Sequence, residues 1–261
     1  MAVLELRDIA VTFGPFQAVA GVGLSVHAGE IVGLIGPNGA GKTVTFNVIT
    51  GLQRPSTGAV LLHGLDVTGA APHERTAQGM GRTFQVVQLF SGLSVVENLM
   101  VAAHRHTKGG VIADALLLPT RKRALAEARE RSYAVLDFLG LVGLADLPAD
   151  SLPVGSGRLV ELGRALCLQP DVLLLDEPAS GLDPTETHAL VELLGRIRGT
   201  LGTAMLLVEH DMGVVMPLCD HIVVMNFGRV IAAGRPASVR TDPSVLEAYL
   251  GTPEPEEVVT P

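Results

Sequence analysis

The chain has 261 residues, of which 48% are hydrophobic, and its formal net charge is −8. A hydrophobic fraction of this size predicts a substantial core and excludes a disordered chain. The acidic balance argues against a nucleic-acid-binding surface. Two cysteines form no disulfide framework and favour a reducing compartment. No run of about 18 uncharged apolar residues occurs, so we expect no membrane-spanning helix.

The first ninety residues alternate short β-like runs with turns. Apolar positions alternate at 4–11 and 19–26, and residues 30–35 form the continuous apolar run of a buried strand. A Gly-rich turn follows, then a predicted helix from Lys42 to Thr50 that ends at Gly51. A turn at 55–58 precedes a further predicted strand at 59–62.

The middle of the chain, residues 94–163, carries few strand signals and several helical ones. A helix is predicted over 121–139, with its apolar face made by Leu125, Ala128, Ser132, Val135, Leu136 and Leu139. Glu127 and Arg131 have the i,i+4 spacing of an ion pair on its polar face. We interpret the charges of this helix as a solvated face, not as a binding patch.

Beyond Asp171 the alternation returns, with strands at 172–175, 204–208 and 222–225 and a helix at 185–198. The pattern predicts an α/β fold with a largely parallel sheet covered by helices, and an additional antiparallel β layer near the N-terminus. We expect one domain over residues 1–251. Its α/β core would comprise 1–92 and 164–251, its helical insertion 93–163, and residues 252–261 would form a disordered acidic tail.

A complete G-x-x-x-x-G-K-[ST] motif lies between the buried strand and the first helix: Gly36, Pro37, Asn38, Gly39, Ala40, Gly41, Lys42 and Thr43. Glycines allow the backbone to wrap an anion, so that N–H groups and the helix N-terminus point at a phosphate. Lys42 would bring its charge to the β- and γ-phosphates, and the Thr43 hydroxyl would ligate Mg²⁺. The motif predicts ATP with Mg²⁺ as cofactor.

A phosphate loop also needs a carboxylate for the metal and a group that orients water. The apolar strand at 172–175 ends in Asp176 and Glu177. Asp176 would hold the Mg²⁺ shell, and Glu177 would act as the general base toward the attacking water. His210, just after the strand at 204–208, would hydrogen-bond the γ-phosphate, although a lone histidine at a strand end is more often structural.

The order of further motifs makes the chain resemble the ATP-binding subunits of ABC transporters along nearly all of its length. The corresponding stretches are Walker A, Thr83-Phe84-Gln85 (Q-loop), Leu152-Pro153-Val154-Gly155-Ser156 (signature), Leu175-Asp176-Glu177-Pro178 (Walker B), Gly181-Leu182-Asp183 (D-loop) and Glu209-His210-Asp211 (switch histidine). The resemblance implies a P-loop NTPase (RecA-like) core with an N-terminal antiparallel β subdomain and an inserted α-helical subdomain.

The resemblance also implies roles for individual residues. Gln85 would contact Mg²⁺ and the membrane partner, Asp183 would lie at a dimer seam, and Phe13 would stack on adenine. Each ATP would lie between one chain's phosphate loop and the other's signature motif, here Gly155 and Ser156. The position after Thr43 often carries a second hydroxyl. Here it is Val44, which still offers its backbone N–H.

More narrowly, the chain is similar to the larger ATP-binding subunit of branched-chain amino acid importers. This similarity rests on the stretches 81–85, 93–99 and 119–121, on 209–212 with Val215 and Met216, and on 247–251. Urea and lipopolysaccharide transport ATPases share parts of these stretches. The resemblance implies integral membrane permease subunits as direct partners, a solute-binding protein as an indirect one, and a peripheral position on the cytoplasmic face of the membrane.

The signature motif departs from the family's LSGGQ pattern. Pro153 replaces the serine and Ser156 the glutamine, so that only Leu152 and Gly155 remain. Loss of one hydrogen bond to a charged group costs about 1.5–3 kcal/mol. The Gly155 backbone and a helix N-terminus would still bind phosphate. We therefore hypothesise a heterodimer with two unequal ATP sites, in preference to a homodimer.

Other function classes fit the sequence less well than transport does. Soluble ABC ATPases that act on ribosomes or DNA usually carry two cassettes or long coiled coils, whereas this chain has one Walker A motif and no heptads. Its acidic charge also disfavours nucleic acid as a partner. A GTPase should show an Asn-Lys-x-Asp element, which is absent, and no second-substrate site of a kinase is recognisable.

Overall fold

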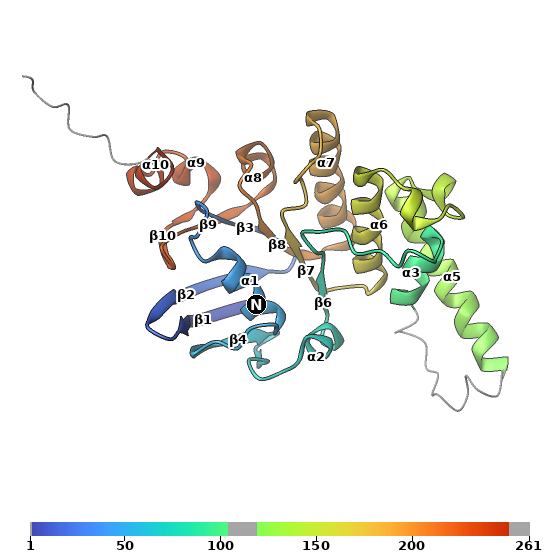
Figure 1. Cartoon of the computed structure of the whole chain (residues 1–261), viewed down its shortest axis with the longest axis horizontal. Coiled ribbons are helices and arrows are strands. Elements are labelled where there is room, and N and C mark those ends of the chain that lie inside the picture. Colours follow the sequence, from blue (N-terminus) through green and yellow to red (C-terminus); the bar gives the residue numbers. More distant parts are fainter. Residues whose placement is uncertain (1, 104–118, 251–261) are drawn as a thin grey trace, which may run out of the picture. The chain divides into compact units, whose positions relative to one another are not determined.

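The computed structural model describes residues 2–103 and 119–250 (Figure 1). The chain forms two compact units. The first unit comprises the chain up to Pro72 and from Leu207 onward, and the second comprises His73–Leu206. The predicted tail at 252–261 lies outside the described residues. Among the residues described, no helix is both long enough and apolar enough to cross a membrane.

The first unit contains two layers of strands with short helices. Its elements are β1 (Ala2–Phe13), β2 (Phe16–His27), β3 (Ile31–Ile35), α1 (Lys42–Thr50), β4 (Thr57–Leu62), β5 (Leu65–Asp66), α8 (Met212–Leu218), β9 (His221–Asn226), β10 (Arg229–Gly234), α9 (Pro236–Val239) and α10 (Pro243–Leu250). One antiparallel sheet has the order β2-β1-β4-β5. In the other, β3 pairs parallel with β9, and β9 pairs antiparallel with β10.

The second unit combines a parallel strand pair with a group of helices. Its elements are α2 (Pro72–Ala77, which starts at the last residue of the first unit), β6 (Met80–Arg82), α3 (Val95–Ala103), α5 (Pro119–Leu139), 3-10 turns at Val142–Leu144 and Ala149–Ser151, α6 (Val154–Cys167), β7 (Val172–Asp176), α7 (Pro184–Leu201) and β8 (Ala204–Val208, whose last two residues belong to the first unit). β6 and β7 pair in parallel, and β8 follows β7 in the strand order. Helices α3, α5 and α6 pack against one another (Figure 1).

The buried strands are the ones that the sequence predicts. All five residues of β3, of β7 and of β8 are buried, as expected for continuous apolar runs covered on both faces. Helix α1 ends at Gly51, whose φ of 80° provides the left-handed cap that the glycine predicts. The mixture of strands and helices confirms the predicted α/β class.

Helix α5 corrects two details of the sequence analysis. Glu127 pairs with Arg123 at 2.9 Å, not with Arg131, because both arginines satisfy the four-residue spacing and only packing distinguishes them. Leu125, predicted for the apolar face, is 48% exposed, whereas Ala128 and Leu136 are buried.

Helix α6 is continuous from Val154 to Cys167 and so passes through the boundary placed after residue 163. Gly163 lies where α6 meets its neighbours. A Cβ there would come within 2.9 Å of the Leu139 Cδ1 atom and 3.3 Å of the Leu99 Cδ2 atom. The close approach of α3, α5 and α6 therefore depends on the absence of a side chain at this position.

We predict that neither native cysteine reacts with a thiol reagent at pH 8 while the chain is folded. Cys167 is fully buried, and burial raises the pKa of its thiol to about 12, so almost no thiolate forms. Titration with Ellman's reagent should show no fast reaction in buffer and two reactive thiols in denaturant. Val86→Cys, at a position 71% exposed, is the positive control. Rapid modification of Cys167 in the native chain would contradict this burial.

Candidate active site

The phosphate loop connects β3 to α1 within the first unit. Gly36, Gly39 and Gly41 have φ values of 148°, 80° and 97°, which side-chain-bearing residues rarely adopt. Gly41 is the N-cap of α1, and no side chain caps that end. The N–H groups in the first turn of a helix have no intrahelical acceptor. The loop and the start of α1 can therefore present main-chain donors to an anion, as predicted.

Neighbouring backbone fixes the loop tightly. A Cβ on Gly36 would lie 2.1 Å from the Met225 carbonyl oxygen in β9, and one on Gly41 would lie 2.8 Å from the carbonyl oxygen of Ala18 in β2. The turn after β9 completes the support, because the Gly228 N–H donates to the Ala40 carbonyl at 3.0 Å. The shape of the loop is thus set by strands that are far apart in the sequence.

The side chains of the motif lie along the loop and the first turn of α1. Lys42 is 8% exposed, and its Nζ donates to the Gly36 and Pro37 carbonyls at 2.6 and 3.0 Å. Thr43 is exposed at the first turn of α1, while Val44 is half-buried. Pro37 is half-buried, Asn38 is exposed, and Ala40 is buried. The ammonium group therefore lies against the loop itself, near where a phosphate would be bound.

Three further side chains of the first unit bear on the site. Phe13 ends β1 and is 49% exposed, which leaves its ring accessible for stacking on a base. His210 is also exposed, and its Nδ1 lies 3.9 Å from the Glu209 carboxylate. Burial raises the pKa of Tyr249 on α10, and a hydrogen bond with the Gly36 backbone opposes this rise. The C-terminal helix thus reaches the phosphate loop.

The second unit carries the acidic pair. Asp176 is the last residue of β7 and is 7% exposed. Glu177 follows with a φ of 46°, an unusual value for a residue with a side chain. Left-handed backbone at such a residue costs about 1–3 kcal/mol and is common at functional sites. The sequence alone did not indicate this left-handed conformation of Glu177.

Gln85 and Glu177 are brought together in this unit. The Gln85 Nε2 donates to the Glu177 Oε2 at 2.9 Å, although 92 positions separate the two residues. Arg158 of α6 donates to the Glu177 carbonyl at 3.4 Å. The amide of the Q-loop and the candidate general base thus form one hydrogen-bonded pair.

The D-loop and the signature motif are linked through α7. The Asp183 side chain caps this helix by accepting hydrogen bonds from the Thr185 and Glu186 N–H groups at 2.7 and 2.8 Å. In turn, the Glu186 side chain accepts a hydrogen bond from the Asp183 N–H at 3.0 Å. A Cβ on Gly155 would lie 2.6 Å from the Glu186 Oε1. Only a glycine at this point of α6 therefore lets Glu186 keep this position.

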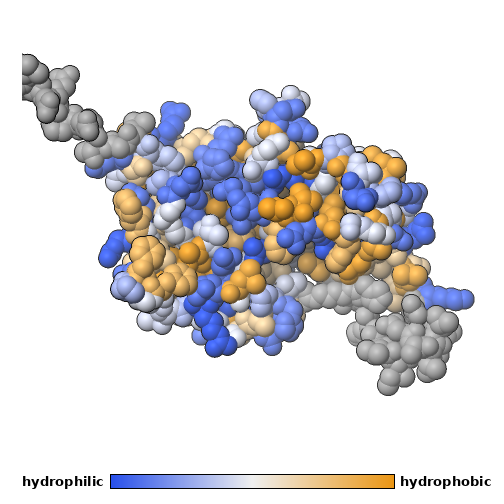
Figure 2. Space-filling model, in the orientation of Figure 1, coloured by the Kyte–Doolittle hydropathy of each residue, from blue (hydrophilic) through white to orange (hydrophobic). Residues whose placement is uncertain are grey.

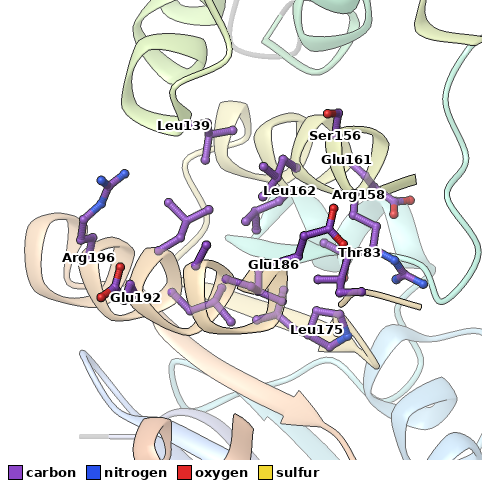
Figure 3. A pocket seen from close by; sticks show the side chains of 18 of the residues that line it. Thr83, Leu139, Ser156, Arg158, Glu161, Leu162, Leu175, Glu186, Glu192 and Arg196 are labelled. Carbon is purple, nitrogen blue, oxygen red and sulfur yellow. The ribbon is translucent and has the colours of Figure 1, made fainter. Parts of the chain in front are cut away.

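A cavity of about 370 Å³ lies between α6 and α7 (Figure 3). Leucines make much of its wall, and Thr83, Arg158, Glu161, Glu186 and Arg196 add polar groups. Figure 3 shows Glu186 extending from α7 toward α6. The cavity contains Gly155 and Ser156 in its wall, so the altered signature motif borders a space that the α6–α7 packing does not fill.

Three residues that matter to the geometry were not among the predicted site residues. Buried Glu209 accepts from the His210 N–H at 3.0 Å and so fixes the backbone before His210. In the first unit the Tyr249 side chain contacts the Gly36 main chain, and in the second unit the Arg158 side chain contacts the Glu177 carbonyl. Glu209 and Tyr249 appear in the sequence analysis only as members of motifs, with no role of their own. No sequence pattern pointed to Arg158. Among the described residues, no cluster of three or more histidine, cysteine or acidic side chains could hold a metal ion by itself.

We predict that Gly36→Ala lowers the affinity for MgATP by more than about tenfold, because the added methyl both strains the backbone and meets the Met225 carbonyl. Gly64→Ala is the matched control, since Gly64 also has a positive φ, of 79°, but no atom lies within 4 Å of a Cβ there. Fluorescent-nucleotide titration measures both variants. Equal affinities in the two variants would show that the loop does not depend on this close contact.

Comparison with known proteins agrees with this geometry. Residues 19–180 match the ABC transporter family, and residues 229–259 match the branched-chain amino acid ATP-binding cassette transporter C-terminal family. The high-affinity branched-chain amino acid transport ATP-binding protein LivG of Escherichia coli is 42% identical, with 95% of this chain and 97% of LivG aligned. The corresponding protein BraF of Pseudomonas aeruginosa is 41% identical, with 95% and 98% aligned.

Solved structures give the same result. A nucleotide-free ATP-binding cassette from an ABC transporter superposes with a TM-score of 0.83 at 34% identity and covers 97% of this chain and 100% of its own. The ADP conformation of an ABC transporter cassette superposes with a TM-score of 0.82 at 33% identity and the same coverage. The chain belongs to the ABC transporter family, as one of its ATP-binding cassettes.

Proposed function

We propose that this chain binds and hydrolyses ATP to power an ABC importer of branched-chain amino acids. The observation that carries the proposal is the phosphate loop, which has three glycines with positive φ and is held by contacts with β2, β9 and the β9–β10 turn. The proposed solute rests on relatives that align over nearly their whole length, since LivG and BraF are named for branched-chain amino acid transport.

The residues present fit ATP with Mg²⁺. Thr43 offers a hydroxyl, Asp176 a carboxylate and Gln85 an amide oxygen, which are the oxygen donors that Mg²⁺ prefers. When bound, the cation would neutralise charge on the β- and γ-phosphates. Lys42 and the N-terminus of α1 would bind the same phosphates, and Phe13 would stack on adenine.

Glu177 would orient and deprotonate the attacking water. Its hydrogen bond with Gln85 holds the carboxylate in place. His210 would donate a hydrogen bond to the γ-phosphate, with its backbone held by buried Glu209. As the general base, Glu177 would act on the attacking water and not on the bound phosphates, so hydrolysis would depend on this residue and nucleotide binding would not.

The altered signature motif supports an unequal pair of ATP sites. Pro153 is the N-cap of α6 and provides no side-chain hydrogen bond, so this chain offers only the Gly155 and Ser156 end of the helix to a nucleotide. We infer a heterodimer in which the competent site combines Lys42 and Glu177 of this chain with the partner's signature motif. Permease subunits would dock on this chain at the cytoplasmic face of the membrane, and a solute-binding protein would act through them.

We predict that Glu177→Gln in the reconstituted pair lowers ATP hydrolysis by about 100-fold or more, while MgATP binding is retained. The reason is that the amide keeps the size of the side chain and loses the base. Glu192→Gln, an exposed position on α7, is the control and should hydrolyse at the wild-type rate. Activity of Glu177→Gln near wild type would place the competent site elsewhere.

We also predict that leucine, isoleucine or valine on the cognate binding protein stimulates hydrolysis by the assembled transporter in vesicles. Urea should leave the rate unchanged, because a solute acts only through a binding protein that closes around it. Phosphate release with each solute measures the effect. Stimulation by urea and not by leucine would reassign the solute without changing the ATPase role.

A further inference from the structure

The Q-loop segment between β6 and α3 exposes apolar side chains although its backbone is firmly held. Phe84, Val86 and Phe90 are 41%, 71% and 47% exposed. Apolar residues also reach the surface among polar ones on the face shown in Figure 2. In a flexible loop, such apolar side chains would tend to fold back onto the protein surface. The contacts that hold the backbone of this segment therefore keep its apolar side chains exposed.

Helix α6 holds both main-chain groups of Gln88. The Gln88 N–H donates to the Glu161 Oε1 at 3.4 Å, and the Gln88 carbonyl accepts from the Arg164 Nη1. Glu161 is only 4% exposed. Burial raises the pKa of Glu161, and hydrogen bonds from the Gln88 and Phe84 backbones together with the nearby Arg164 and Arg158 guanidinium groups act against that rise.

The two ends of the segment are also fixed. The guanidinium of Arg164 lies 4.8 Å from the centre of the Phe90 ring, and that of Arg82 lies 4.7 Å from the centre of the Phe84 ring. Fully buried Asn98 of α3 accepts from the Phe90 N–H at 2.9 Å and donates to its carbonyl at 3.2 Å. Cation–π contacts of this kind are attractive, so both arginines help to hold the rings at the ends of the segment.

Arg158, Glu161 and Arg164 are spaced by three along α6, so they lie along one stripe of the helix. Arg158 holds the Glu177 carbonyl, while Glu161 and Arg164 hold the loop that carries Gln85. The same helix begins at the altered signature motif. Helix α6 therefore contacts Glu177 directly and contacts the segment that carries Gln85.

We propose that Glu161 and Arg164 are positioning residues that lock the Phe84–Phe90 segment to α6, so that Gln85 stays against Glu177 and the apolar side chains stay exposed. The consequence for catalysis rests on the proposed function, whereas the lock itself does not. Movement of the signature end of α6 would then be passed directly to Gln85 and to the exposed rings.

The test compares Glu161→Gln and Arg164→Lys with matched controls. Arg196→Lys serves for Arg164, because Arg196 also stacks on a ring, Phe138, and donates to the Phe138 carbonyl at 2.7 Å, away from the Q-loop. Glu127→Gln on α5 serves for Glu161. Gln88→Ala completes the set, since only the main chain of Gln88 is used. Each is made in the full chain with a nitroxide at Val86→Cys, where the native cysteines are buried.

In Glu161→Gln and Arg164→Lys we expect faster nitroxide motion, because charged hydrogen bonds to the loop are lost. In the reconstituted pair we expect a kcat for MgATP hydrolysis lowered about tenfold, with KM within about twofold, because the phosphate loop is intact. Arg196→Lys, Glu127→Gln and Gln88→Ala should match the parent chain. Unchanged nitroxide motion, equal effects of Arg164→Lys and Arg196→Lys, or parallel changes in kcat and KM would overturn the proposal.

Two results separate this proposal from the proposed function. If the reconstituted pair that contains the parent chain hydrolyses no ATP, the ATPase role fails, and nitroxide motion alone still decides whether the lock exists. If Glu161→Gln does not fold, Arg164→Lys against Arg196→Lys decides it, since both variants keep the positive charge.

Discussion

The structure depends first on a backbone conformation that only glycine adopts without strain. A triphosphate carries several negative charges in a small volume, and converging N–H groups can surround it more closely than side chains can. Gly36 and Gly41 approach carbonyl oxygens of β9 and β2 so closely that even a methyl group would collide with them. The strands on either side thus specify the loop, and the loop in turn positions Lys42 and the start of α1.

The second constraint lies in the other unit, where α6 supports the Gln85–Glu177 pair that we propose to be catalytic. Its polar stripe reaches the Glu177 main chain on one side and the Gln88 main chain on the other. Burial raises the pKa of Glu161, and the backbone N–H groups and arginines around the carboxylate offset this effect only in part. Such an arrangement fixes geometry more than it adds stability.

Sequence reasoning identified the elements with strong local signals. Helix α1 follows from the glycines at both of its ends, and β3 and β7 follow from uninterrupted apolar runs. It missed α8 and β10, since α8 has seven residues and contains Pro217, and β10 is only partly buried. A one-sided strand of mixed small residues lacks the continuous apolar pattern.

Contacts to the main chain leave little trace in a sequence. The hydrogen bonds of Glu161 and Arg164 are made with the main chain of Gln88 and use no property of its side chain. The contact of Tyr249 with the Gly36 main chain joins the C-terminal helix to the phosphate loop. The sequence also does not predict that Glu127 pairs with Arg123 and not with Arg131, because helical spacing permits both ion pairs. Motif order therefore predicts the residue types at the site, while the supports of that site require coordinates.

Isothermal titration calorimetry with ATP and Mg²⁺ tests the central claim most directly. The account predicts saturable heat from the wild-type chain, the same heat from Lys122→Ala, whose lysine is exposed on α5, and none from folded Lys42→Ala at equal concentrations. Absence of heat from the folded wild-type chain, or unchanged binding by Lys42→Ala, would contradict it.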